Sequence, residues 1–102
     1  MTVKTYTGDR TIDGVQVMVD GAPLDPRFDL KTLSELGFEW GYEGTAPTQL
    51  ALALAADVFG DDALALKVCD TLMKRVVANF ANEWVMTEGD IKDAVSDQVA
   101  LK

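Results

Sequence analysis

The residues best suited to chemistry lie in the run Trp-Gly-Tyr-Glu-Gly-Thr at positions 40–45. Glycines that lead into a helix N-terminus leave free backbone amides, which bind an anion or a carboxylate. The rings of Trp40 and Tyr42 could stack on a base or another flat ring, and Gly44 and Thr45 would lie at the start of the helix. The run therefore predicts one candidate site, for a small ligand or an anion.

The same run differs from the established phosphate-binding loops. No Lys-Ser or Lys-Thr pair follows the glycines, and their spacing is not that of a dinucleotide fingerprint. Glu39 and Glu43 would repel a phosphate. A sharp turn and a helix cap explain each residue without any ligand. We therefore treat ligand binding by Trp40, Tyr42, Gly44 and Thr45 as the alternative function.

The distribution of charge gives a second candidate site. The chain carries 17 acidic and 9 basic residues, a net charge of −8. Residues 13–62 hold ten acids against Arg27 and Lys31, so the whole excess lies in that half of the chain. Clustered carboxylates suit a partner with a basic surface, although such charge can also serve only solubility. The acids that we assign to partner binding are Asp20, Asp25, Asp29, Glu35, Glu39 and Glu43.

Composition disfavours several other kinds of chemistry. The chain has no histidine, which removes the usual general base and the commonest metal ligand. Its one cysteine, Cys69, lies in an apolar helical pattern that is typical of a small buried side chain. The spacing of the aspartates does not match a calcium loop, and phosphate binding needs clustered Lys and Arg. We predict no catalytic residue, no metal, no cofactor and no direct contact with nucleic acid.

The elements that must position these residues form a single α+β domain over residues 1–102. The predicted order is β-β-β-α-α-β-α, with an antiparallel sheet of three to four strands packed on two to three helices. Alternation of apolar residues predicts strands at residues 2–7, 15–19, 37–42 and 83–86. The third strand would carry an aromatic face of Phe38, Trp40 and Tyr42.

Turns and one long loop separate the strands. The dipeptides Gly8-Asp9 and Asp13-Gly14 are turn signals between the first two strands. Residues 22–36 contain two prolines and are predicted to form an extended loop. Within it, Arg27 stands between Asp25 and Asp29, which predicts local ion pairs rather than a ligand contact.

Three helices are expected. The first is capped by Thr45, runs to Phe59 and is apolar on most sides, so it should form the core. Gly60 ends it, and Asp61 caps a second helix that extends to Phe80. The third covers residues 88–101 after a capping box of Thr87 and Asp90. Its apolar stripe would close the core or join two copies of the chain in a homodimer.

Two sequence runs carry a resemblance to a known family. The runs YTGDRTIDGVQVMVDGAPLDPR and FEWGYEGTAPTQLALALAADVFGDDALAL, within residues 6–91, resemble small bacterial and phage-associated proteins of a domain-of-unknown-function family. The most specific part is the pattern FxWGYxGTxPxQLALAL, and the departure is Ala46, where the family usually has Gly. The resemblance implies occurrence on chromosomes, plasmids and phages, and it supplies no activity or site residues.

These observations favour a non-enzymatic module that binds another protein. Its acidic surface would contact a basic partner, and the sharper hypothesis is an anti-CRISPR or other anti-defence inhibitor that masks a nucleic-acid-binding surface. The chain has no apolar run of about 18 residues, so no membrane span is expected. A polar N-terminus without the apolar core of a secretory signal predicts a cytoplasmic protein.

Overall fold

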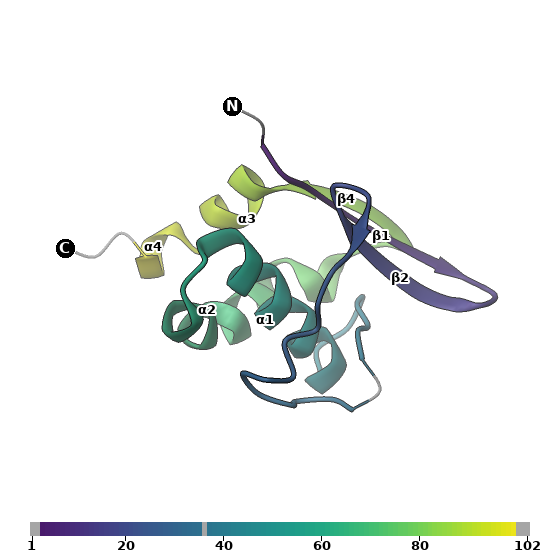
Figure 1. Cartoon of the computed structure of the whole chain (residues 1–102), viewed down its shortest axis with the longest axis horizontal. Coiled ribbons are helices and arrows are strands. Elements are labelled where there is room, and N and C mark those ends of the chain that lie inside the picture. Colours follow the sequence, from purple (N-terminus) through teal and green to yellow (C-terminus); the bar gives the residue numbers. More distant parts are fainter. Residues whose placement is uncertain (1–2, 36, 100–102) are drawn as a thin grey trace.

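One antiparallel sheet and a group of helices form the structure, a computed structural model that describes residues 3–35 and 37–99 (Figure 1). Its strands are β1 (Thr5–Thr11), β2 (Gly14–Val19), β3 (Ala22–Pro23) and β4 (Glu83–Thr87), in the order β3-β2-β1-β4 across the sheet. Its helices are α1 (Thr45–Phe59), α2 (Asp62–Arg75), the 3-10 helix η1 (Val77–Asn79), α3 (Glu88–Ala94) and α4 (Ser96–Val99). The predicted α+β architecture and element order are confirmed.

Helix α1 is the centre of the core, as its sequence predicts. Every side chain from Leu50 to Ala56 is buried. A helix that is apolar on all sides has to be covered on all sides. Helix α2 packs along it after a short connection, in which Gly60 adopts a left-handed conformation and Asp61 caps α2 by accepting a hydrogen bond from the Leu64 amide.

The sheet covers another side of α1, and strand β1 makes the connection. Tyr6 is fully buried, and its hydroxyl donates to the Asp57 carboxylate of α1 at 2.6 Å. The same carboxylate accepts from Lys4 at 3.2 Å. These contacts fix which face of β1 looks inward, since alternate residues of a strand point to opposite faces.

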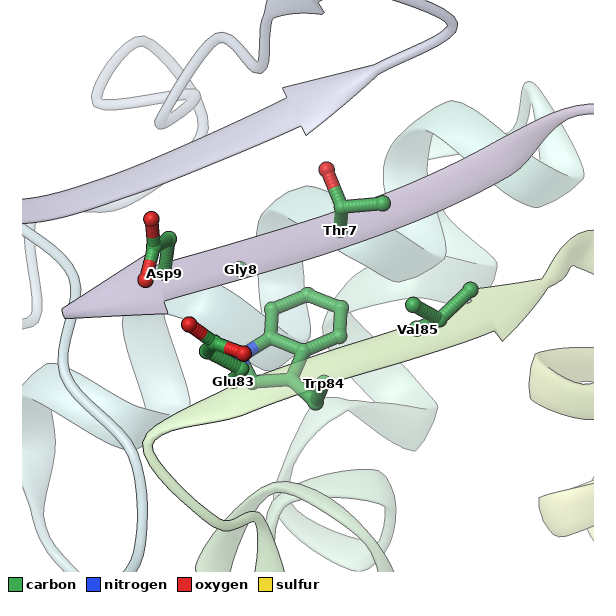
Figure 2. Close-up of a pocket in the computed structure, with 6 residues that line it drawn as sticks. All are labelled: Thr7, Gly8, Asp9, Glu83, Trp84 and Val85. Carbon is green, nitrogen blue, oxygen red and sulfur yellow. The ribbon is translucent and has the colours of Figure 1, made fainter.

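The dipeptide Gly8-Asp9 lies inside β1, so the turn predicted there is wrong. Gly8 pairs with Val17 on one side and with Trp84 of β4 on the other. The Trp84 ring occupies the space above Gly8, and a Cβ atom built at Gly8 would lie 2.1 Å from the indole nitrogen (Figure 2). Glycine is therefore required here by close packing of an aromatic ring and not by a turn.

The third strand predicted at residues 37–42 is wrong, because these residues form no strand. The short strand β3 takes the third place instead. Gly37 and Gly41 have positive φ angles, which interrupt an extended backbone. Arg10 donates to the Trp40 carbonyl, and the Gly41 amide donates to the Val77 carbonyl. The segment is therefore held by a side chain and by η1 rather than by a neighbouring strand.

Three predicted helix ends also differ from the structure. The N-cap of α1 is Gly44, and Thr45 is the first helical residue. Helix α2 ends at Arg75, before the predicted end at Phe80. The Val77 carbonyl accepts from the amides of Gly41 and Phe80, so it does not continue the hydrogen-bond pattern of an α-helix. The helix predicted at 88–101 breaks at Val95, where Arg75 donates to the Ala94 carbonyl. Residues 100–101 of that prediction lie outside the described residues, whereas the capping box at its start is confirmed.

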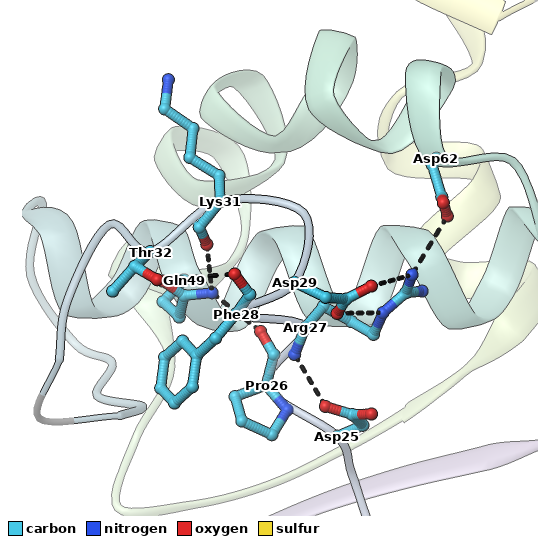
Figure 3. Close-up of polar contacts among 9 residues, drawn as sticks. All are labelled: Asp25, Pro26, Arg27, Phe28, Asp29, Lys31, Thr32, Gln49 and Asp62. Atoms are coloured by element: carbon cyan, nitrogen blue, oxygen red, sulfur yellow. Dashed lines mark hydrogen bonds and ion pairs between the residues drawn. The ribbon is translucent and has the colours of Figure 1, made fainter.

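The loop from Leu24 to Gly44 is fixed to α1 by one buried side chain, Gln49 (Figure 3). Its amide oxygen accepts from the backbone amides of Leu33 at 2.7 Å and Ser34 at 3.2 Å. Its amide nitrogen donates to the carbonyls of Pro26 at 2.7 Å and Lys31 at 3.1 Å. All four hydrogen-bonding positions of the Gln49 amide are therefore used. They bind backbone groups of a loop that forms no regular β-ladder between its described residues.

We predict that Gly8→Ala lowers the free energy of unfolding by about 1–3 kcal/mol, because the added methyl group must displace the Trp84 ring. Chemical denaturation followed by tryptophan fluorescence measures the change. Gly89→Ala is the matched control, since a Cβ atom at Gly89 meets nothing closer than 3.7 Å. Equal midpoints for Gly8→Ala and the wild type would contradict the packing argument.

Gln49→Ala should cost about 2–4 kcal/mol, because it leaves four buried backbone groups without their partner and opens a cavity. The loop at residues 26–34 should also become sensitive to limited proteolysis under conditions in which α1 stays intact. Gln98→Ala is the control, since the Gln98 side-chain oxygen has no hydrogen-bond partner among the residues that the structure describes. A loop that stays resistant to protease in Gln49→Ala would show that other contacts hold it.

Candidate functional site

The three aspartates assigned to partner binding make hydrogen bonds or ion pairs within the chain, and Figure 3 shows those of Asp25 and Asp29. Asp20 has a positive φ angle and accepts from the Thr5 amide at 2.9 Å. Asp25 accepts from the Arg27 amide, and the Arg27 guanidinium makes a bidentate contact with Asp29 at 3.0 Å. The local ion pairing predicted for Arg27 is confirmed, and it extends to Asp62 of α2 at 3.3 Å.

This pairing changes the electrostatics of the loop. The hydrogen bond that Asp29 accepts from Arg27 lowers the pKa of Asp29 below its usual value, so this carboxylate stays charged to lower pH. Each contact also uses an oxygen that an incoming basic group would need. Asp20, Asp25 and Asp29 therefore add to the negative field of the molecule while serving the fold.

The three glutamates assigned to partner binding lie further along the loop. Glu39 forms an ion pair with Arg10, whose guanidinium also contacts Asn82 at 2.6 Å and lies 4.9 Å from the centre of the Trp40 ring. Glu35 and Glu43 are exposed and have no hydrogen bond or ion pair within the described residues. Of these glutamates, Glu35 and Glu43 are the ones with free carboxylates.

The run at residues 40–45 separates into buried and exposed parts. Trp40 is 1% exposed and packs edge-on against Trp84, with ring centres 5.7 Å apart, so its face is not open to a stacking ligand. Tyr42 is half exposed, and its ring lies over Gly44, where a Cβ atom would approach it to 2.9 Å. The Thr45 side chain makes no cap hydrogen bond. The ring of Tyr42 thus covers the start of α1, and ligand binding at this turn stays a prediction.

A pocket of about 520 Å³ lies on the face of the sheet that points away from the helices (Figure 2). It is lined by Thr7, Gly8, Asp9, Glu83, Trp84 and Val85. In antiparallel strands, paired residues point to the same face. Thr7 is paired with Val85 and Asp9 with Glu83, so these four side chains share the outer face, opposite to buried Tyr6 and Trp84.

Asp9 and Glu83 form an unusual cross-strand pair. The Glu88 amide donates to the Lys4 carbonyl, and alternation from there makes Asp9–Glu83 one of the pairs without direct backbone hydrogen bonds. In such pairs the side chains are closest, and like charges directly opposite destabilise the sheet. Neither carboxylate has a hydrogen bond or an ion pair within the described residues. The outer face therefore carries two adjacent uncompensated negative charges.

Trp84 carries an unpartnered donor on the inner face of the sheet. Trp84 is 7% exposed, and its indole N–H is buried without a hydrogen-bond partner among the described residues. The ring lies on the inner face of the sheet, over Gly8, whereas Asp9 and Glu83 lie on the outer face. Buried polar groups without partners are uncommon in folded proteins. The donor and the two carboxylates therefore lie on opposite faces of the sheet.

Sequence reasoning did not find this site. The sequence predicts a turn at Asp9, and it predicts a short strand at Glu83 without indicating which strand pairs with it. The two are separated by most of the chain, and only the register between β1 and β4 brings them together. The one signal in the sequence is a single acid in each of the two strands, which is too common to single them out.

A second pocket, of about 430 Å³, lies between the loop and helix α2. It is lined by Leu30, Lys31, Leu33, Thr48, Leu66, Cys69 and Asp70. Burial raises the pKa of the Cys69 thiol, so this group is less reactive than a free cysteine. Of the polar side chains in this lining, Thr48 donates to the Gly44 carbonyl and Asp70 forms an ion pair with Lys74.

Residues 3–35 and 37–99 offer few groups for acid–base or metal chemistry. Burial and the hydrogen bond to Asp57 raise the pKa of Tyr6 well above its ordinary value, so it stays protonated at neutral pH. Within these residues no three Asp, Glu or Cys side chains come together as metal ligands. None of the helices described there is long and apolar enough to cross a membrane.

The opposed carboxylates lead to a stability prediction. Asp9→Asn and Glu83→Gln should each raise the free energy of unfolding by about 0.2–1 kcal/mol, because each removes the repulsion between the paired charges. Asp93→Asn on α3 serves as control and should leave stability nearly unchanged, because its side chain is exposed and has no hydrogen bond or ion pair within the described residues. Thermal unfolding at low ionic strength measures the difference. A loss of stability in both variants would mean that the two acids support the fold.

The comparisons with known proteins confirm one part of the resemblance, the match to a family of unknown function. No curated protein and no solved structure matches the chain. Residues 6–97, which include both strands of the Asp9–Glu83 pair and the loop, match the profile of a family of unknown function, DUF6166. Because this match covers more than half of the sequence, the chain belongs to the DUF6166 family.

Proposed function

We propose that this protein is a non-enzymatic binding module that recognises a basic surface of another protein through its carboxylates. The observation that best supports this function is the Asp9–Glu83 pair on the outer face of the sheet. Keeping two like charges opposite each other costs stability. A Lys or Arg side chain of a partner placed between them would turn this repulsion into attraction.

The six acids assigned from the sequence contribute in two ways. Those that the chain engages, namely Asp20, Asp25, Asp29 and Glu39, supply negative field that attracts a basic partner from a distance. Glu35 and Glu43 have free carboxylates and are candidates for direct contacts. Direct recognition is assigned first to Asp9 and Glu83, because these two are adjacent and uncompensated.

The finer form of the proposal concerns the kind of partner. A surface built to bind the phosphates of a nucleic acid also attracts a chain with a net charge of −8. We place the protein in the cytoplasm as a product of mobile elements that masks such a surface, as an anti-CRISPR or other anti-defence inhibitor does. This form is supported by small size, acidity and the absence of histidine from the sequence.

A pull-down from lysate of the source organism, made with three versions of the protein, tests the proposal. Wild type and the control Asp13→Asn/Asp93→Asn should retain the same basic protein at low salt and release it at high salt. Asp9→Asn/Glu83→Gln should lose it. The control removes the same number of charges, and its Asn-Gly turn is as favourable as Asp-Gly.

With the purified partner, the double variant should bind at least tenfold more weakly and show a smaller dependence of affinity on salt. Nucleic acid should compete with the wild type for the partner if masking is correct. Equal affinity of the double variant and the wild type would overturn the assignment to Asp9 and Glu83. Simultaneous binding of nucleic acid and the protein would overturn the masking form alone.

A further inference from the structure

The sheet has two edges, and they differ in how they are protected. At one edge lies β3, which is two residues long and ends in Pro23. Short edge strands and prolines prevent another chain from pairing. At the other edge lies β4, whose sequence Glu-Trp-Val-Met-Thr contains neither proline nor lysine. Strand β4 is therefore the edge at which an additional strand could pair.

The register identifies the backbone groups that are free at this edge. Because Lys4 and Glu88 are joined by a backbone hydrogen bond, Met86 and Trp84 direct their backbone groups toward β1. Glu83, Val85 and Thr87 direct theirs away from it. The Thr87 amide donates to the Asp90 carboxylate in the capping box, which ends the open edge. Glu83 and Val85 remain, and each offers one donor and one acceptor.

The side chains at the same two positions point to the outer face. Val85 is 65% exposed, and Glu83 is exposed beside Asp9. A strand added to β4 would place alternate side chains over this face. The residue opposite Val85 would meet an apolar surface, and the residue opposite Glu83 would meet the two carboxylates and the pocket between β1 and β4.

We propose that a basic, extended segment of the partner protein adds to β4 as an antiparallel fifth strand. The preferred segment has an apolar residue, any residue and then Arg or Lys, so that the apolar side chain packs on Val85 and the cation reaches Asp9 and Glu83. This proposal rests on the proposed function and specifies how the basic partner binds. Main-chain hydrogen bonds supply the affinity of such strand addition, and alternate side chains supply its selectivity.

A second copy of this chain is a poorer occupant of the edge. Each copy carries a net charge of −8, and β4 has no basic residue that could neutralise Asp9 and Glu83 of its neighbour. Edge charges of this kind are a common device against self-association. The same charges that oppose a second copy attract a basic strand.

The test uses the peptide acetyl-Thr-Thr-Val-Thr-Arg-Thr-Thr-amide as probe, with the 15N-labelled full chain observed by NMR. Binding should shift the amide signals of Glu83 and Val85 and slow their hydrogen exchange. A matched peptide with Glu in place of Arg should bind at least tenfold more weakly. Methylation of the Val and Arg amides of the probe should also weaken binding at least tenfold, because it removes the donors that pair with β4.

Two variants separate this mode of binding from the proposed function. Val85→Pro removes the free edge amide without touching a bond to β1, and it should lose the probe and the partner. Asp9→Asn/Glu83→Gln should reduce binding of the Arg probe to the level of the Glu probe. The methylated probe tests strand addition independently of these variants, because it is measured with the wild-type protein.

Four results would overturn the inference. They are no binding of the Arg probe at millimolar concentration, equal binding of the methylated probe, unchanged partner affinity in folded Val85→Pro, and a dimer of the wild type that Val85→Pro dissociates. In the third case, a partner still lost by Asp9→Asn/Glu83→Gln would leave the proposed function intact. Equal affinity of Asp9→Asn/Glu83→Gln and the wild type for the purified partner would overturn both the inference and the assignment of recognition to these two carboxylates.

Discussion

The burial of α1 on all sides is the constraint that arranges the rest of the molecule. No residue from Leu50 to Ala56 has a side chain free to face water, so a cover is needed in every direction. Helix α2, the inner face of the sheet, α3 and the loop each supply part of it. The loop cannot cover α1 by apolar contacts alone, because its backbone groups need partners. Gln49 supplies these partners from the helix itself.

Local patterns predicted most of the fold. Caps, glycine stops and helical periodicity placed α1 and the start of α2, since these signals act within a few residues of the chain. The errors arose where a distant group decided the local structure. Arg10 holds residues 39–40 out of a strand, and Arg75 ends α3 by binding the Ala94 carbonyl. Gly8 resembles a turn residue until the Trp84 ring is placed above it.

The site was harder to predict than the fold for the same physical reason. The acids that looked most concentrated in the sequence meet basic or amide groups nearby, as Asp29 meets Arg27. Proximity along the chain favours such local compensation. The one pair of adjacent uncompensated charges among the described residues comes instead from two strands that are far apart in the sequence, β1 and β4. Clustered acids in a sequence therefore predict the overall electrostatic field of a protein better than they predict which carboxylates lack a partner.

The pairing of β1 with β4 also orders the events of folding. These strands lie more than 70 residues apart along the chain, from Asp9–Glu83 to Thr5–Thr87. The entropy of closing so long a loop is recovered only when the helices between them are compact. On a ribosome, β1 leaves the tunnel long before β4, and until then its Gly8 edge and the core beneath the Trp84 ring stay open. The strand that completes the core is thus made after α1 and α2, and the proposed binding face forms only when β4 pairs with β1.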